Sequence, residues 1–171
     1  IDFGGISLTP VGNDTTKFTG MFDGNGHVVG NGQINLSASD YVGLFGYVGV
    51  GGEIHNLGVN AVEMTGNNYV GGLAGWNDGT VVSCFSTCTA TGVQCVGGLI
   101  GENYTSGTIT SCYATGAVTG TRCIGGLVGE NRYLMTSCYA TGAVINGDDY
   151  VGGLVGNSAN LVIGCFWDTE S

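Results

Sequence analysis

Residues 95–118 read CVGGLIGENYTSGTITSCYATGAV, and residues 123–144 read CIGGLVGENRYLMTSCYATGAV. The VGGL-type block that opens both stretches occurs at 41–46, 69–75, 95–101, 123–129 and 150–156. Successive blocks start 28, 26, 28 and 27 residues apart. The cysteines of the SCYATGAV-type block, Cys84, Cys112, Cys138 and Cys165, follow the same period. Two motifs that share one period predict an internal repeat of roughly 27 residues.

The repeated blocks are short, rich in β-branched and aromatic residues, and bounded by Gly, Asn and Asp, which is typical of strands and turns. Two or three glycines in seven residues would cost a helix ~1 kcal/mol each. Each repeat is therefore expected to stack on the previous one in parallel register, about 4.8 Å away. The sequence predicts an all-β fold, a right-handed parallel β-helix (β-solenoid) of about six turns. We expect an irregular first turn or cap over residues 1–40, followed by one continuous repeat domain over residues 41–171.

The composition excludes several classes of function. The chain of 171 residues has 35 Gly, a net charge of −10 and only three basic residues, too few for a nucleic-acid surface or for binding anionic lipids. No apolar run reaches the ~18 residues of a membrane-spanning helix, so we expect no membrane insertion. A start at Ile1 and an abrupt end at Ser171 favour a processed chain or a fragment. Seven cysteines in a chain poor in Lys and Glu indicate an oxidising, extracellular or cell-surface location.

The repeat register predicts which side chains form columns along the axis. Leu57 aligns with the cysteines of the second block, and Val59 aligns with small residues such as Ala114 and Ala140. Inward-facing Leu57 and Val59 indicate that these two columns face the core. The column between them, with the Thr column two residues further on, is then predicted to face outward. Its members are Phe85, Tyr113, Tyr139 and Phe166, with Thr87, Thr115 and Thr141.

Cysteine supplies the candidate cross-links. Cys95 and Cys123 replace Tyr at one stacked position, which favours a disulfide between two turns; the alternative is two small apolar side chains. The column of Cys84, Cys112, Cys138 and Cys165 could form bridges or stay reduced. Cys88 has no partner in the repeat and is the candidate for the odd thiol. No C-x-x-C pair is present and both histidines lie far away, so neither a metal site nor a cofactor is expected.

Other motifs give weaker signals. Asn13, Asn35 and Asn103 begin N-x-Ser/Thr triplets, the acceptor pattern for N-glycosylation. The acidic residues occupy mostly non-equivalent turn positions, and no paired carboxylates or Ser/His/Asp set stands out, so no catalytic residues and no enzymatic activity are expected.

These blocks resemble the GLUG-repeat family, whose Gly-Leu-variable-Gly core is written here as GLAG, GLIG and GLVG. FDGNGHVV at 22–29 is similar to an N-terminal segment of the family, SCYATGAV to its inter-block strand, and CFWDTES at 165–171 to a segment that closes such arrays. GNGQI at 30–34 departs from the pattern and is expected to interrupt the first turn. The resemblance implies a secreted or surface-attached, adhesin-like repeat protein without catalytic residues of its own.

The expected function is structural. Solenoids end in open strand edges, and both ends of this chain are apolar. The chain is therefore expected to self-associate end to end into a surface filament, stalk or sheath, or to lie within a longer repeat array. The alternative is an adhesin that binds surface glycans through the outward aromatic and Thr columns. Ice binding through the Thr column is a third and weaker hypothesis.

Overall fold

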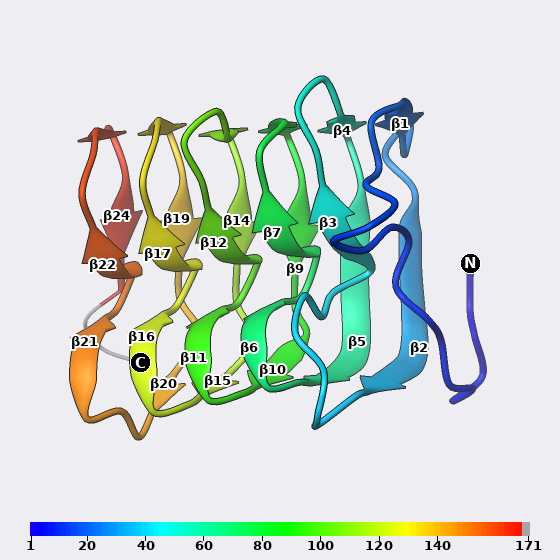
Figure 1. Cartoon of the computed structure of the whole chain (residues 1–171), viewed down its shortest axis with the longest axis horizontal. Coiled ribbons are helices and arrows are strands. Elements are labelled where there is room, and N and C mark those ends of the chain that lie inside the picture. The colour runs from blue at the N-terminus through cyan, green and yellow to red at the C-terminus, as the bar shows by residue number, and fades with distance from the viewer. Residues whose placement is uncertain (169–171) are drawn as a thin grey trace.

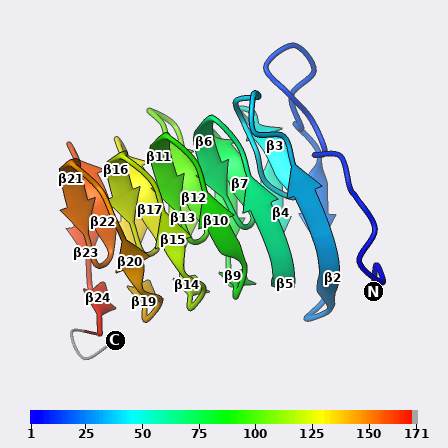
Figure 2. The same cartoon turned by 90° about the horizontal axis from the view of Figure 1, so that it is seen from below.

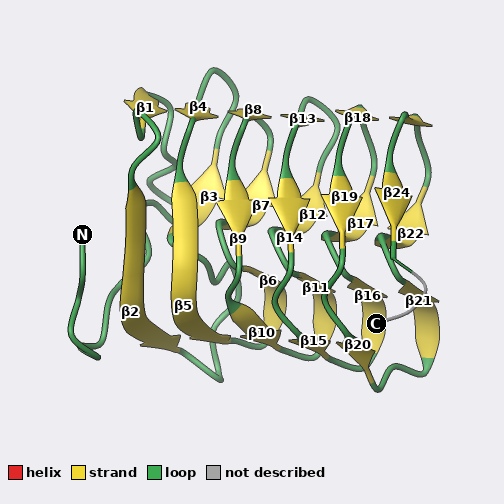
Figure 3. Cartoon of the chain, turned by 180° about the vertical axis from the view of Figure 1, so that it is seen from behind, coloured by secondary structure: helices red, strands yellow, loops and turns green. Residues whose placement is uncertain are grey.

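The computed structural model describes residues 1–168 and shows a right-handed parallel β-solenoid (Figures 1 and 3). All strand pairs are parallel, and no helix occurs in this part of the chain. The predicted fold class is confirmed. The VGGL-type blocks build a sheet of five strands, so the solenoid has about five turns, slightly fewer than expected.

Each turn passes through four sheets that run along the axis. The four-stranded sheet contains β6 (Asn68–Gly71), β11 (Gln94–Gly97), β16 (Arg122–Gly125) and β21 (Asp149–Gly152). The five-stranded sheet contains β3 (Phe45–Val48), β7 (Ala74–Asn77), β12 (Ile100–Asn103), β17 (Val128–Asn131) and β22 (Val155–Ser158).

The other two sheets carry the second repeated block. The six-stranded sheet contains β1 (Met21–Asp23), β4 (Glu53–His55), β8 (Thr80–Val82), β13 (Thr108–Thr110), β18 (Met135–Thr136) and β23 (Val162–Ile163). The nine-stranded sheet contains β2 (Val28–Asn35), β5 (Gly58–Thr65), β9 (Phe85–Ser86), β10 (Thr89–Thr91), β14 (Tyr113–Ala114), β15 (Val118–Thr119), β19 (Tyr139–Ala140), β20 (Val144–Ile145) and β24 (Phe166–Trp167).

The pairing register follows the repeat. Val59 pairs with Ser86, Ser86 with Ala114, and Ala114 with Ala140, so equivalent residues of successive turns lie directly above one another. These side chains are buried, and the Leu of each VGGL block fills the centre of the coil: Leu73, Leu99 and Leu127 are fully buried. The core is thus a set of apolar columns parallel to the axis.

Two corners of every turn depend on left-handed backbone. The residue before VGG has a positive φ in all five turns: Tyr41 60°, Tyr69 57°, Cys95 53°, Cys123 54° and Tyr150 57°. The residue before the cysteine column does the same, at Ser83, Ser111, Ser137 and Gly164. Single non-Gly residues in this region are disfavoured by roughly 1–2 kcal/mol. Strand pairing on both sides of each corner must offset this cost. The chain therefore turns at the same residue in every repeat.

Close approach explains the second glycine of the VGGL block. A methyl group added at Gly126 would lie 3.1 Å from the Cβ of Ala140 and would clash with the carbonyl oxygen of Gly153 in the next turn. The small-residue column and the glycine column thus face each other across the coil. This contact requires both columns to stay small.

The N-terminal segment behaves differently from the repeats. Residues 1–20 make only isolated bridges to β2 and β3, such as Asp2 with Gly30 and Val11 with Phe45, and run beside the first turn (Figure 2). Regular pairing begins at β1. The expectation that GNGQI interrupts the first turn is wrong: residues 28–35 form the continuous strand β2, which pairs with β5 from end to end. Positive φ angles at Asn31 and Ala61 place matching bends in the two strands.

Candidate functional site

One side of the solenoid carries two columns whose chemistry changes along the axis. The residue before VGG is Tyr41, Tyr69, Cys95, Cys123 and Tyr150 in successive turns. The neighbouring column, on the five-stranded sheet, is Tyr47, Trp76, Glu102, Glu130 and Asn157, which pair in register. An aromatic cluster in the first two turns therefore becomes a cysteine and glutamate cluster in the next two. Both columns change in the same two turns.

The thiol and carboxylate groups of these turns lie close together. The sulfurs of Cys95 and Cys123 and a carboxylate oxygen of Glu130 all lie within 4.8 Å of one another. The Cys95 thiol donates to Glu130 Oε2 over 3.5 Å. All three residues are buried. The structure holds Cys95 and Cys123 as thiols. The disulfide between them stays a prediction.

Arg132 covers this cluster from the solvent side. Its Nε lies 3.0 Å from Glu102 Oε1 and its Nη2 lies 3.0 Å from Glu130 Oε1. The contact with Glu102 is an ion pair without hydrogen-bond alignment, because this buried oxygen has no hydrogen-bond partner. The guanidinium also lies 5.5 Å from the ring centroid of Tyr104. Asn157 donates to Glu130 Oε1 over 3.3 Å, so both outer contacts of Glu130 use the same oxygen.

Burial dominates the electrostatics of the cluster. Burial and, after it, the charge of Glu130 raise the pKa of Glu102 to about 7, against the opposing effect of Arg132. Burial also raises the pKa of the Cys95 thiol, with added repulsion from Cys123 and the two carboxylates, and that of Cys123. Because the thiolate is the reactive form of cysteine, these groups are poor nucleophiles at neutral pH. Metal binding and disulfide formation use the same thiolate form, so either would have to displace the thiol protons.

The other cysteines have structural contacts. In the column Cys84, Cys112, Cys138 and Cys165, each thiol donates to the carbonyl oxygen two residues earlier, over 3.1–3.4 Å. The first three residues also donate their backbone N–H to the sulfur of the next turn. The Cys88 thiol is buried, and its backbone N–H donates to Ser86 Oγ. Bridging in the column stays a prediction; in the structure all four sulfurs act as thiol donors.

A buried asparagine ladder was missed by the sequence analysis. Asn77 Nδ2 donates to Asn103 Oδ1, and Asn103 Nδ2 donates to Asn131 Oδ1, each over 2.8 Å. All three side chains are fully buried. Their recurrence directly after Gly-x in the GWN, GEN and GEN segments was the signal that could have revealed the ladder.

One of the three predicted glycosylation sites, Asn103, belongs to this ladder, and that prediction is wrong. Asn103 is completely buried and its amide nitrogen is bonded to Asn131, so it cannot carry a glycan in the folded chain. Asn13 and Asn35 are exposed, and their modification stays a prediction.

The aromatic column lies on the outer side of the nine-stranded sheet. The rings of Phe85, Tyr113, Tyr139 and Phe166 stack with centroids 4.9–5.3 Å apart and interplanar angles of 5–6°. Each inner ring therefore covers the face of its neighbour, and only the ring edges and the outer face of Phe166 remain open. Thr87 and Thr141 are half-buried and Thr115 is exposed, and Thr87 donates to Asn60. A sugar ring would find few free aromatic faces here.

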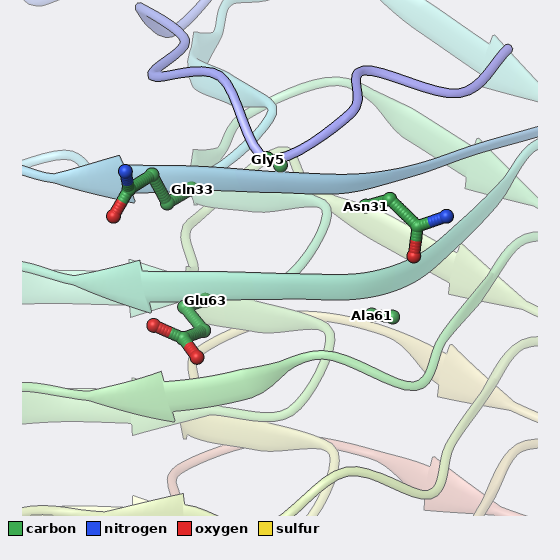
Figure 4. Close-up of a pocket in the computed structure, with 6 residues that line it drawn as sticks. Gly5, Asn31, Gln33, Ala61 and Glu63 are labelled. Carbon is green, nitrogen blue, oxygen red and sulfur yellow. The ribbon is translucent and has the colours of Figure 1, made fainter.

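A shallow hollow lies over β2 and β5, on a different part of the surface (Figure 4). It is lined by Gly5, Asn31, Gln33, Ala61 and Glu63, with Gly32. Glu63 is its single carboxylate, so the hollow lacks the carboxylate pair that glycoside hydrolysis uses.

Comparison with known proteins finds the GLUG motif in two successive repeats of this chain. Residues 92–119 and 120–145 match the model of the GLUG motif, which confirms the predicted resemblance over these two repeats. A stretch of 100 residues, 57% of the chain, is 41% identical to Halomucin of Haloquadratum walsbyi. A stretch of 84 residues, 47% of the chain, is 33% identical to a protein of Evansella cellulosilytica named a Gly-rich membrane protein. The matches span 1% and 10% of the length of these relatives. No solved structure gives a significant match.

Proposed function

We propose that this chain is a non-enzymatic structural module of a cell-surface protein, and that its solenoid joins another copy end to end to build a filament, stalk or sheath. The name of one relative as a membrane protein and the GLUG motifs support a surface location. Among residues 1–168 no helix is long and apolar enough to cross a membrane.

The observation that carries the proposal is the change in exposure of equivalent core positions at the last turn. Ile124 and Met135 are fully buried, whereas their partners in the next turn, Val151 and Val162, are 47% and 38% exposed. A further layer of strands would pair with the open edges of β21 to β24 and would cover these apolar side chains. Phe166 ends the aromatic column, and its outer face is open to stacking by a further aromatic ring.

Exposed apolar side chains gather at both ends of the coil. Of the 17 large exposed ones among the described residues, six lie within residues 1–28 and eight within residues 145–167. One end of a copy placed against the other end of the next is a heterologous contact, and such contacts propagate into fibres when they do not close. The apolar ends therefore favour an axial polymer over a side-by-side assembly.

The experiment is electron microscopy and sedimentation of the full chain at rising concentration. Wild type is expected to form rods longer than one copy, and Val162→Lys, which places a charge on the open end, is expected to shorten or abolish them. The matched control is Val93→Lys, because Val93 is 49% exposed on the side of the coil. Wild type that stays monomeric at high concentration, or equal assembly of the two variants, would contradict the proposal.

A further inference from the structure

The correlated change of the two columns is not required by a structural role for the repeats. Cys95 and Cys123 replace tyrosine, and in the same two turns Glu102 and Glu130 stand where the preceding turn has Trp76. A disulfide alone would need only the two cysteines. The added carboxylates are buried beneath Arg132, so they are held where solvent cannot hydrate them.

The geometry of these side chains resembles a tetrahedral site for a borderline-soft cation. With zinc–sulfur bonds of about 2.3 Å and zinc–oxygen bonds of about 2.0–2.2 Å, ligand atoms on one zinc ion lie roughly 3.6–3.8 Å apart. The sulfur of Cys95 lies 3.5 Å from Glu130 Oε2, and all three ligand atoms lie within 4.8 Å of one another. A shift of about 1 Å in the Cys123 side chain, which side-chain rotation can supply, would bring all three ligand atoms to these distances and leave the fourth position to water.

The two oxygens of Glu130 have separate partners. Oε1 receives Arg132 and Asn157, whereas Oε2 is turned toward the thiols. Outer partners of this kind orient ligating carboxylates in metal sites. We propose that Cys95, Cys123 and Glu130 bind one divalent cation of the zinc class, with Arg132 and Asn157 as positioning residues.

Binding balances in charge. The cation forms two bonds to sulfur, and the two thiols release two protons to solvent, so the net charge of the site is unchanged. Sulfur ligands favour zinc-class ions over Ca²⁺ or Mg²⁺. The linear spacing rule missed this set because Cys95 and Cys123 are 28 residues apart in sequence and meet only through stacking.

The test uses the full chain, fully reduced, with Zn²⁺ for stoichiometry and Co²⁺ as a spectroscopic probe. One ion per chain is expected, with a sulfur-to-cobalt charge-transfer band. Cys123→Ser should lose the band, and Glu130→Gln should weaken affinity about 10–100-fold. The matched control Cys165→Ser removes a half-buried thiol of the other column and should leave both readouts unchanged.

The site would be overturned by no binding by the reduced wild type, by binding in Cys123→Ser equal to wild type, or by loss of binding in Cys165→Ser. Glu130→Gln keeps the shape of the side chain and so remains informative if Cys123→Ser fails to fold. Unchanged affinity in folded Glu130→Gln would remove the carboxylate from the ligand set and contradict the proposal.

Discussion

The buried asparagine ladder offers the sharpest test of how the turns are held together. In Asn103→Ala the middle member is removed, which deletes the bond from Asn77 and the bond to Asn131, both 2.8 Å long. Two amide groups then remain buried without these partners: the Nδ2 of Asn77 and the Oδ1 of Asn131.

The expected loss of stability follows from that count. A buried polar group left unsatisfied costs about 1–3 kcal/mol, so two such groups predict a loss of about 2–6 kcal/mol. This is a large share of the ~5–15 kcal/mol that stabilises a typical protein. Asn35→Ala is the matched control, since Asn35 is exposed on β2 and should change stability by no more than about 0.5 kcal/mol.

The assay is denaturant unfolding followed by far-UV circular dichroism, with Asn77→Ala and the double variant completing a cycle. We expect a coupling energy between Asn77 and Asn103 of about 0.5–3 kcal/mol, as for residues in one hydrogen-bond network. If Asn103→Ala costs less than about 1 kcal/mol, or no more than Asn35→Ala, the ladder does not stabilise the coil and the reasoning fails.

Two further predictions concern a glycine and a buried tyrosine. Gly116→Ala places a methyl group against the carbonyl oxygen of Cys88 and should destabilise the chain by about 1–3 kcal/mol in thermal unfolding, whereas Gly20→Ala, with 3.7 Å of clearance, should be nearly neutral; equal effects would contradict the packing argument. Burial, aided by the charge of Asp78 nearby, raises the pKa of Tyr47 above its ordinary value of 10.0. The folded state therefore keeps a proton that the unfolded state loses, and stability should fall as pH rises beyond 10. Tyr47→Phe should reduce this fall, and a wild-type free energy of unfolding that stays constant from about pH 9 to pH 11 would count against it.

The fold was accessible from sequence because two motifs with one period define both the strands and their register. The inward direction of the cysteine and alanine columns follows from the alignment with Leu57 and Val59. The structure has about five turns rather than six, because residues 1–20 add bridges rather than strands to the first turn.

The candidate site was only half visible in the sequence. The replacement of tyrosine by Cys95 and Cys123 stood out, but the significance of Glu102 and Glu130 depends on which sheet they join and what lies beside them. Asn103 shows the same limit from the other side, because an acceptor triplet carries no information about burial. Side-chain environment arises here from stacking between turns about 27 residues apart, which local patterns do not report.

The asparagine ladder also bears on how such chains can diversify. Asn77, Asn103 and Asn131 end β7, β12 and β17, and between each of them and the next strand the chain leaves the coil for a few residues. Counted to the paired positions Val81, Ile109 and Met135, the segment after Asn103 is two residues longer than those after Asn77 and Asn131, yet β13 returns to the same column as β8 and β18. Because the hydrogen-bonded asparagine fixes the residue before this corner, additional residues can be inserted there without disturbing the neighbouring turns. Variation among relatives in length and composition is therefore expected to collect at this edge, which makes it the natural place to graft an epitope or a binding loop.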